Sequence, residues 1–217
     1  KAILGNCSAG YFCLAGSNTP TPLQSLVRDA NFGNICPKGT FCPKASALYT
    51  ACEPGTYQGT AGQSACLSVP EGFFTLDRST IEPCPTGFYC FNGSKVAPRP
   101  CPPGTFNNVL GSTKPNACSI CTEGMYCASP NLTKPSGPCF AGFLCTKGVE
   151  VPNPPGLLNA TAALIGGGGG ACPPGFYCPQ GTVKMMPCPA GTYNNRSSAE
   201  SLSFCMPCSA GRFCSYE

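Results

Sequence analysis

Cysteine is the residue type with the greatest chemical capacity in this chain. The 217 residues include 20 cysteines and no histidine. Cysteine can pair as a disulfide, bind a metal or act as a redox centre, whereas histidine is the commonest general base and a leading metal ligand. The missing histidine and the density of cysteine favour disulfides, which persist in the oxidising compartments of secreted proteins. The even number is consistent with complete pairing.

Two Cys-x-x-Cys pairs have the spacing of a zinc half-site or a redox pair. They are Cys118–Cys121 and Cys205–Cys208, and each lies where one repeated unit meets the next. Without histidine, structural disulfides are the favoured interpretation. The only aspartates, Asp29 and Asp77, are far apart in sequence. We therefore expect no metal, no cofactor and no catalytic residue, in a protein that is not an enzyme.

One short unit recurs along the chain: a cysteine, two residues, a glycine, two residues and a second cysteine. The short units are Cys7–Cys13, Cys36–Cys42, Cys84–Cys90, Cys121–Cys127, Cys139–Cys145, Cys172–Cys178 and Cys208–Cys214. A long unit begins with Cys-x-x-Gly-Thr and a Tyr or Phe, and one further cysteine follows it. The long units run from Cys52 to Cys66, from Cys101 to Cys118 and from Cys188 to Cys205.

A degenerate unit indicates how the cysteines pair. Gly72 stands where a short unit needs its glycine, but Val69 and Thr75 replace both cysteines. Joint loss is expected if the two cysteines of a short unit bond to each other, because losing one alone would leave a free thiol. The predicted disulfides are Cys7–Cys13, Cys36–Cys42, Cys52–Cys66, Cys84–Cys90, Cys101–Cys118, Cys121–Cys127, Cys139–Cys145, Cys172–Cys178, Cys188–Cys205 and Cys208–Cys214. The sequence leaves open an interleaved pairing across the two Cys-x-x-Cys steps.

The short unit predicts a reversal of the chain. In Cys-Pro-x-Gly, proline suits position i+1 of a β-turn and glycine suits position i+3, which brings the two cysteines within disulfide range. Short strands such as Thr56–Tyr57 and Thr105–Phe106 are expected to pair in antiparallel hairpins. We predict a small disulfide-rich, all-β fold with almost no helix, in which tandem short β-hairpin modules stack into an extended rod.

The repeats divide the chain into five predicted segments. A short unit with a linker fills residues 1–35 and 139–171, and cysteine-rich modules fill residues 36–83, 84–138 and 172–217. Similar stretches begin at Cys7 and Cys139, so the chain contains a super-repeat of about 135 residues whose second copy is truncated. The cysteine-free linkers are Leu14–Ile35 and Thr146–Ala171. The second linker contains Gly166–Gly170, for which we predict flexibility rather than phosphate binding.

Charge and hydropathy limit the possible partners. Only 10% of the residues are charged, and no two of the 13 Lys and Arg residues are adjacent, so no nucleic-acid partner is expected. No stretch resembles a signal peptide or a membrane span, and the longest apolar run, Ala160–Ala171, is short and rich in glycine. Because secretion requires a signal, we expect this chain to be a segment of a larger protein, without membrane insertion of its own.

The repeated motifs resemble a known class of extracellular repeat. CPxG-[T/F]-[F/Y]-C, and CxPGT-[Y/F] followed by Cys-x-x-Cys, resemble the ephrin-receptor-like, GCC-type cysteine-rich repeats, which are similar to the cysteine-rich modules of tumour-necrosis-factor receptors. The resemblance covers most of the chain outside the linkers and breaks at Val69 and Thr75. It implies a disulfide-bonded, mostly β, extracellular rod. Long arrays of this kind are similar to protist and algal surface proteins, including flagellar-hair (mastigoneme) fibres.

Glycosylation would supply the solubility that the low charge does not. The N-x-S/T sequons are at Asn6, Asn92, Asn131, Asn159 and Asn195. Asn131 and Asn159 lie in loop-like sequence and are the strongest candidates, whereas the sequon of Asn6 contains a cysteine. Thr19 and Thr21 alternate with prolines, which suits O-glycosylation. A plain extended linker is the alternative interpretation of that stretch.

These features together predict a structural role. We expect a glycosylated, extracellular or cell-surface repeat protein that self-associates into a filament or tandem array and forms a rod within a surface fibre or coat. The resemblance adds the flagellar or ciliary surface as a location. The alternative is a cysteine-rich ectodomain stalk of a receptor or adhesin that binds a protein ligand along its length.

Overall fold

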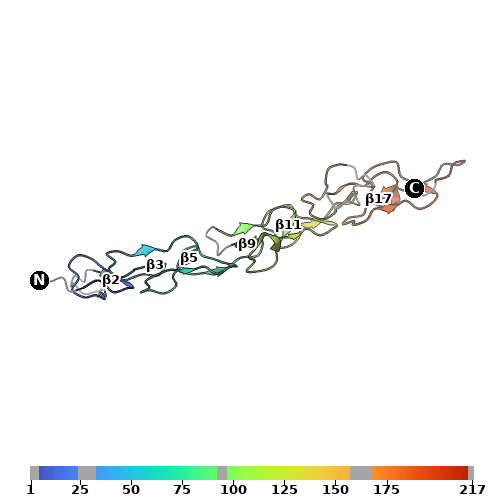
Figure 1. The fold of residues 1–217 in the computed structure, drawn as a ribbon. Coiled ribbons are helices and arrows are strands. Elements are labelled where there is room, and N and C mark those ends of the chain that lie inside the picture. The colour runs from blue at the N-terminus through green and yellow to red at the C-terminus, as the bar shows by residue number, and fades with distance from the viewer. Residues whose placement is uncertain (1–4, 24–32, 92–96, 157–167, 215–217) are drawn as a thin grey trace. The chain divides into compact units, whose positions relative to one another are not determined.

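The computed structural model of the chain describes residues 5–23, 33–91, 97–156 and 168–214. Its regular structure is almost entirely β, as short strands joined by turns and loops (Figure 1). The helices among these residues are η1 (Pro115–Ala117) and η3 (Leu202–Phe204), each a single turn of 3₁₀ helix. The prediction of a small disulfide-rich, all-β fold built of tandem hairpin modules is therefore confirmed.

The strands of the described residues pair with their neighbours in the chain to form two-stranded sheets. The pairs are β1 (Tyr11–Cys13) with β2 (Gly33–Ile35), β3 (Thr40–Phe41) with β4 (Thr50–Ala51), β5 (Thr56–Tyr57) with β6 (Leu67–Ser68), β7 (Phe73–Phe74) with β8 (Glu82–Pro83), β9 (Phe88–Tyr89) with β10 (Arg99–Pro100), β11 (Thr105–Phe106) with β12 (Ser119–Ile120), β13 (Met125–Tyr126) with β14 (Gly137–Pro138), β15 (Phe143–Leu144) with β16 (Gly170–Ala171), β17 (Phe176–Tyr177) with β18 (Met186–Pro187), and β19 (Thr192–Tyr193) with β20 (Met206–Pro207). Each pair joins the strand after a glycine turn to the residues just before the next unit's first cysteine. The predicted strands Thr56–Tyr57 and Thr105–Phe106 are confirmed as β5 and β11.

The described chain falls into two compact bodies. The first comprises Lys1–Pro85, Tyr89–Arg99 and Leu110–Pro115, and the second comprises Thr86–Phe88, Pro100–Val109 and Asn116–Glu217. The division passes through the short unit Cys84–Cys90 rather than between the predicted modules.

The turn inside each unit differs from the predicted one by a single residue. In the unit that begins at Cys36, the N–H of Thr40 donates to the carbonyl oxygen of Pro37 over 3.3 Å. The turn therefore starts at proline rather than at cysteine and places Gly39, with φ of +75°, at position i+2. That geometry is a type II turn, whose third residue needs a positive φ. The prediction of proline at i+1 and glycine at i+3 was wrong.

One backbone hydrogen bond joins every unit to the next. The N–H of each unit's first residue donates to the carbonyl oxygen of the turn glycine in the preceding unit. The bonds are Cys36 to Gly10, Cys52 to Gly39, Val69 to Gly55, Cys84 to Gly72, Cys101 to Gly87, Cys121 to Gly104, Cys139 to Gly124, Cys172 to Gly142, Cys188 to Gly175 and Cys208 to Gly191. The bond is present on both sides of the degenerate unit, so the loss of its cysteines does not interrupt this register.

Eight of the units also have a described loop that reaches back over earlier units. One residue of this loop, which we call the loop residue, has a positive φ. The loop residues are Ala45, Gly62, Arg78, Gly111, Asn131, Gly148, Gly181 and Ser198. All the non-glycine residues with positive φ in the described chain are therefore at this one repeated position. Seven of the loop residues, all except Arg78, donate their N–H to the first cysteine of the preceding unit, as Asn131 does to Cys101 over 2.9 Å.

The loop residue also lies against the turn glycine of the unit before that. A Cβ atom added at Gly124 would lie 2.5 Å from the carbonyl oxygen of Gly181, and one added at Gly87 would lie 2.2 Å from that of Asn131. No side chain fits in such a space. Glycine is thus required at the turn for two reasons: its φ is positive, and a side chain would collide with the loop two units further along.

The two cysteine-free segments are insertions within hairpins rather than linkers between modules. The segment Leu14–Ile35 begins directly after β1 and ends with β2, which pairs antiparallel with β1. Thr146–Ala171 leaves from β15 and returns as β16 in the same way. The usual bond from the next cysteine to the turn glycine follows each insertion. Gly170 lies in β16, whereas Gly166 and Gly167 lie outside the described residues.

The bases of both insertions are built alike. The residue after the first cysteine donates its N–H to a proline carbonyl twelve positions further on, from Ser8 to Pro20 and from Phe140 to Pro152. A second proline two residues later packs against a glycine near the end of the insertion. A Cβ atom on Gly33 would lie 2.7 Å from Pro22, and one on Gly169 would lie 2.4 Å from Pro154. This correspondence supports the super-repeat.

Replacing Gly124 by alanine is expected to destabilise the chain more than the same change at Gly191. Their φ values are +76° and +80°, so both variants place an L-residue in the left-handed region, which costs about 1–2 kcal/mol. Only at Gly124 would the methyl group meet a backbone atom, the oxygen of Gly181, and such overpacking adds about 1–3 kcal/mol. Urea unfolding of the disulfide-intact variants measures both losses. Equal losses would contradict the close approach.

Candidate functional site: disulfides and the groups that replace them

The described cysteines form ten disulfides, and the bonded pairs are those that the sequence predicts. Seven link the two cysteines of a short unit, namely Cys7–Cys13, Cys36–Cys42, Cys84–Cys90, Cys121–Cys127, Cys139–Cys145, Cys172–Cys178 and Cys208–Cys214. Three link the ends of a long unit, namely Cys52–Cys66, Cys101–Cys118 and Cys188–Cys205. Their Cα–Cα distances run from 5.5 Å in Cys101–Cys118 to 6.3 Å in Cys139–Cys145, within the range a disulfide spans.

These disulfides make up most of the buried interior. Both cysteines of the short units from Cys36 to Cys178 are at most 1% exposed. Few apolar side chains join them; one such cluster is Val149 with Cys139–Cys145, against which Tyr126 packs. In the long units the first cysteine is buried, whereas Cys66, Cys118 and Cys205 are only half-buried. The interior is therefore a series of small covalent clusters rather than one continuous apolar core.

The long units close their turn with an amide side chain instead of a cysteine. In a short unit the second cysteine stands six residues after the first; in the long units Gln58, Asn107 and Asn194 occupy this position, which we call the closing position. Their side chains are at most 5% exposed. Our sequence interpretation missed these residues. Alignment of the long units on the short ones would have found them, because the amide falls where a cysteine is expected.

Hydrogen bonds hold each amide in place. Asn194 donates from Nδ2 to the carbonyl oxygens of Phe176 and Arg196, and its Oδ1 accepts from the N–H of Arg196. Asn107 donates from Nδ2 to the carbonyl oxygen of Phe88 over 2.8 Å. Gln58 donates from Nε2 to the carbonyl oxygen of Ala65 over 2.9 Å. The amides of Asn107 and Asn194 thus tie the long unit to the unit before it, which a disulfide within the unit would not do.

The backbone carbonyl of the closing residue accepts a hydrogen bond that recurs along the chain. At eight of the ten junctions between described units, the turn glycine of one unit donates its N–H to the carbonyl oxygen of the next unit's closing residue. Gly124 donates to Cys145 over 2.9 Å, and Gly175 donates to Asn194 over 2.8 Å. A cysteine and an asparagine therefore present the same acceptor to the preceding unit. What the closing side chain must do is fix the position of that carbonyl.

The degenerate unit uses a third solution. Val69 is 5% exposed and fills the place of the first cysteine. At the closing position, the hydroxyl oxygen of Thr75 accepts a hydrogen bond from the N–H of Arg78 over 2.9 Å. The carboxylate of Asp77 accepts from the backbone N–H and the hydroxyl of both Ser79 and Thr80. Short-range hydrogen bonds thus hold the loop where a disulfide is missing.

These hydrogen bonds also affect the ionisation of Asp77. The hydrogen bond from the Ser79 hydroxyl, followed by those from the backbone of Thr80 and Ser79, holds the pKa of Asp77 well below its ordinary value. A lowered pKa favours the folded loop above the ordinary pKa of aspartate, and that contribution is lost as the pH falls into the acid range. The carboxylate is solvent-exposed, so it acts as a local loop cap.

The predicted sequons lie at different kinds of position. Asn131, Asn195 and Asn6 are exposed, and Asn131 is one of the loop residues with positive φ. Asn92 and Asn159 lie outside the described residues. Thr21, between Pro20 and Pro22 at the base of the first insertion, is exposed, whereas Thr19, just before Pro20, is half-buried. Accessibility allows modification at the three described sequons, and their occupancy stays a prediction.

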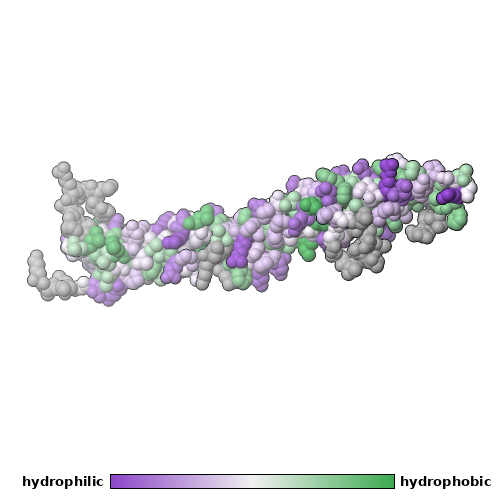
Figure 2. Space-filling model, turned by 90° about the horizontal axis from the view of Figure 1, so that it is seen from above, coloured by the Kyte–Doolittle hydropathy of each residue, from purple (hydrophilic) through white to green (hydrophobic). Residues whose placement is uncertain are grey.

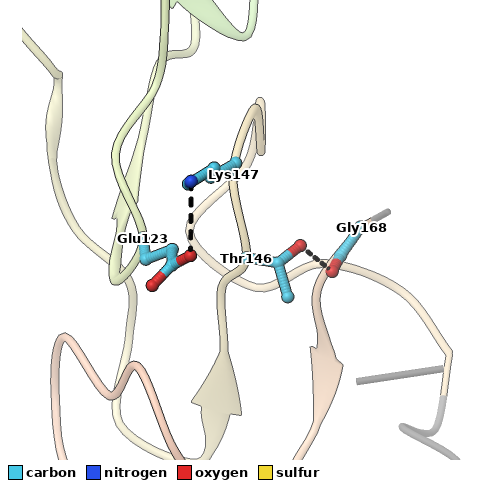
Figure 3. Close-up of polar contacts among 4 residues, drawn as sticks. All are labelled: Glu123, Thr146, Lys147 and Gly168. Atoms are coloured by element: carbon cyan, nitrogen blue, oxygen red, sulfur yellow. Dashed lines mark hydrogen bonds and ion pairs between the residues drawn. The ribbon is translucent and has the colours of Figure 1, made fainter. Parts of the chain in front are cut away.

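Polar contacts between charged side chains are sparse. Among the described residues, the ion pair found is Lys147 with Glu123, whose Nζ and Oε1 atoms lie 3.9 Å apart on the surface (Figure 3). Nearby, the Thr146 hydroxyl donates to the carbonyl oxygen of Gly168 at the base of the second insertion (Figure 3). An exposed pair of this kind contributes little stability. Hydrophobic and hydrophilic residues are interspersed on the face shown in Figure 2.

The cysteines that sequence spacing offered to a metal are engaged elsewhere. Cys118 is bonded to Cys101, and Cys121 to Cys127. Cys205 and Cys208 are bonded to Cys188 and Cys214 in the same manner. Within the described part of the chain, no group of three or more His, Cys, Asp or Glu residues could hold a metal ion. No helix of that part has the length and apolar character needed to cross a bilayer.

A scan against models of protein families gives no match, and a search of curated proteins gives none either.

Replacing Asn194 by alanine is expected to destabilise the second body by about 2 kcal/mol or more, because it removes the side-chain partners of Phe176 and Arg196. Asn194→Gln keeps the amide that stands at this position in the first long unit and should lose less. Thermal unfolding of the oxidised variants measures both. The interpretation fails if Asn194→Ala is as stable as the wild type.

Installing two cysteines in the degenerate unit is expected to create an additional disulfide. Val69 and Thr75 hold the positions of a short-unit pair, and the flanking bonds to Gly55 and from Cys84 keep the usual register. The Val69→Cys/Thr75→Cys variant should therefore oxidise without free thiols and gain about 2 kcal/mol. Thiol titration and denaturant unfolding measure the result, with each single substitution as control. Two persistent thiols in the double variant would show that the unit has a different geometry.

Proposed function

We propose that this chain is a structural part of an extracellular repeat protein, and that it forms a rod within a surface fibre, filament or coat. The observation that carries the proposal is the backbone register, which repeats at every junction of the described units. A register made of backbone groups and turn glycines can extend over any number of units. Such an array has mechanical continuity without needing one large core.

The disulfides indicate the compartment. Ten bonds in 217 residues require an oxidising environment, which is that of extracellular or secreted proteins. A cell-surface and flagellar or ciliary position is the finer proposal, and its support is the resemblance of the CPxG-type motifs to cysteine-rich repeats of surface proteins. The GCC-type repeat family is proposed on the same motifs.

Stiffness would come from contacts between consecutive units. Each unit is bonded to the unit before it through its first residue and its loop, and the loop also lies on the turn glycine two units back. Bending at one junction would therefore disturb two others. Disulfides prevent the single unit from unfolding when the junction is loaded, because each turn is closed covalently.

Glycans are the proposed source of solubility. With 10% charged residues and a net charge of +4, charge repulsion between chains is weak. The exposed sequons at Asn131 and Asn195 could carry glycan without disturbing the register, since their side chains make none of its bonds. Covalent carbohydrate would keep the rods apart except where they are meant to associate.

Small-angle scattering of the disulfide-intact chain tests the rod. A globular protein of this length has a radius of gyration of about 17 Å. The proposal predicts a clearly larger value together with the constant cross-section of a rod. The reduced and alkylated chain is the control, since loss of the disulfides should abolish the constant cross-section. A value near the globular one for the oxidised chain would contradict the rod.

Electron microscopy of the native, unreduced protein, imaged directly from its source, tests the fibre. Filaments with a regular axial repeat are expected. Discrete particles attached at a membrane would contradict the proposal and favour the receptor or adhesin stalk. Antibodies against this chain, with and without prior absorption by the purified chain, provide the matched control for assigning the filaments.

A further inference from the structure

The long-unit disulfides differ from the short-unit disulfides in burial. Cys66 and Cys118, the second cysteines of the first two long units, are half-buried, whereas their partners Cys52 and Cys101 are 0% exposed. Both cysteines of every short unit within Cys36–Cys178 are at most 1% exposed. Further units follow both long units along the chain, so this exposure does not come from the end of the sequence. A dissolved reagent can therefore approach a long-unit disulfide from the side of its second cysteine.

The turn of a long unit is closed without its disulfide. In the second long unit, the N–H of Thr105 donates to the carbonyl oxygen of Pro102 over 3.2 Å. The amide of the closing residue, Asn107, donates to the carbonyl oxygen of Phe88 over 2.8 Å. Cys118 lies beyond this position in the chain, after the 3₁₀ turn η1. In a short unit, by contrast, the second cysteine is itself the closing residue. Opening the long-unit disulfide would thus leave its turn bonded.

The bonds that join this long unit to its neighbours also run through the turn. The N–H of Cys101 donates to the carbonyl oxygen of Gly87 over 2.8 Å, and the N–H of Gly87 donates to that of Asn107 over 2.7 Å. On the other side, the N–H of Cys121 donates to the carbonyl oxygen of Gly104 over 2.8 Å. These backbone groups belong to the turn and to the closing residue, which the amide holds. The register can therefore persist while the disulfide is open.

We propose that the long-unit disulfides are sites of reversible modification by a low-molecular-weight thiol, and that the units stay folded when these bonds open. The thiolate attacks Sγ of Cys118 and forms a mixed disulfide, and the bond to Cys101 breaks with its electron pair on the Cys101 sulfur. The proton that the thiol gave up ends on that sulfur, so the exchange balances without an oxidant. Accessible disulfides are the labile ones, and access decides which sulfur is attacked. The adduct therefore forms on Cys118 and Cys66 rather than on their buried partners.

Such exchange gives the array two classes of disulfide. The buried short-unit bonds stay closed and maintain the register, whereas the long units offer exchangeable bonds at intervals along the chain. A thiol could thus be attached and removed without interrupting the series of units. The inference goes beyond the proposed structural role and applies equally to a fibre and to a receptor stalk.

Exposure of the oxidised chain to reduced glutathione tests the site. Samples are quenched in acid at successive times, free thiols are alkylated, and the peptides are mapped by mass spectrometry without reduction. Cys66 and Cys118 should carry glutathione, and Cys52 and Cys101 the alkyl group, in samples whose short units within Cys36–Cys178 are still unmodified. The same reaction in urea is the control, because unfolding should remove the difference. Equal rates in the folded chain, or glutathione on Cys52 or Cys101, would overturn the inference.

Removal of one disulfide of each kind tests whether the unit needs it. The open-state variant is Cys101→Ala/Cys118→Ala, and the matched control is Cys121→Ala/Cys127→Ala in the next short unit. In each case the N–H of the preceding turn glycine, Gly87 or Gly104, donates to the closing residue of the altered unit.

Hydrogen exchange measures the protection of these two N–H groups. That of Gly87 should stay protected in the open-state variant, whereas that of Gly104 should lose its protection in the control. Lost protection at Gly87, or the same behaviour of the two variants, would show that the long unit depends on its disulfide as a short unit does and would overturn the inference.

Discussion

Covalent closure of a very short turn is the constraint on which this fold depends. A short unit spans seven residues and reverses the chain through a type II turn whose glycine has a positive φ. Such a turn would not persist alone, and no unit is large enough to bury an apolar core of its own. The disulfide restricts the unfolded chain by about 2 kcal/mol per ring. Its cysteines also form most of the buried interior, since most of the fully buried side chains are cysteines.

The closed turn matters because of the backbone groups that it presents. The turn glycine offers its carbonyl to the next unit's first residue, and the closing residue offers its carbonyl to the preceding unit's glycine. Cysteine at position 145, asparagine at position 194 and threonine at position 75 occupy this closing position in three different units. Disulfide and amide are therefore two ways to hold the same carbonyl, and in the degenerate unit the Thr75 hydroxyl instead accepts a bond from the N–H of Arg78 in its own loop. The register between units is more constant than the chemistry that maintains it.

Much of the fold could be predicted from the sequence because its determinants are local. The spacing within a unit defines a ring that only its own cysteines can close, and the joint replacement by Val69 and Thr75 pointed to that pairing. The position of the turn was wrong by one residue. Glycine suits position i+3 of the predicted turn as well as position i+2 of the observed one, and the bond from Thr40 to Pro37 and the positive φ of Gly39 distinguish the two.

The contacts between units could not be predicted in the same way. Their donors and acceptors are backbone groups, which leave no signature in residue type, and the loop residue is Ala45, Asn131 or Ser198 in some units and glycine in others. The insertions have the sequence of linkers because proline and glycine suit both, and the returning strand lies twenty or more residues away. Here the sequence shows which units exist, and the three-dimensional structure shows how they are joined.

The most direct test of this account is the disulfide pattern of the native protein. Digestion in acid without reduction, followed by tandem mass spectrometry that cleaves the backbone between Cys118 and Cys121, would separate the two candidate pairings at that step. Local closure predicts that Cys118 is bonded to Cys101 and Cys121 to Cys127. Bonds from Cys101 to Cys121 and from Cys118 to Cys127 would contradict it, because the turn of that unit would no longer be closed by its own cysteines.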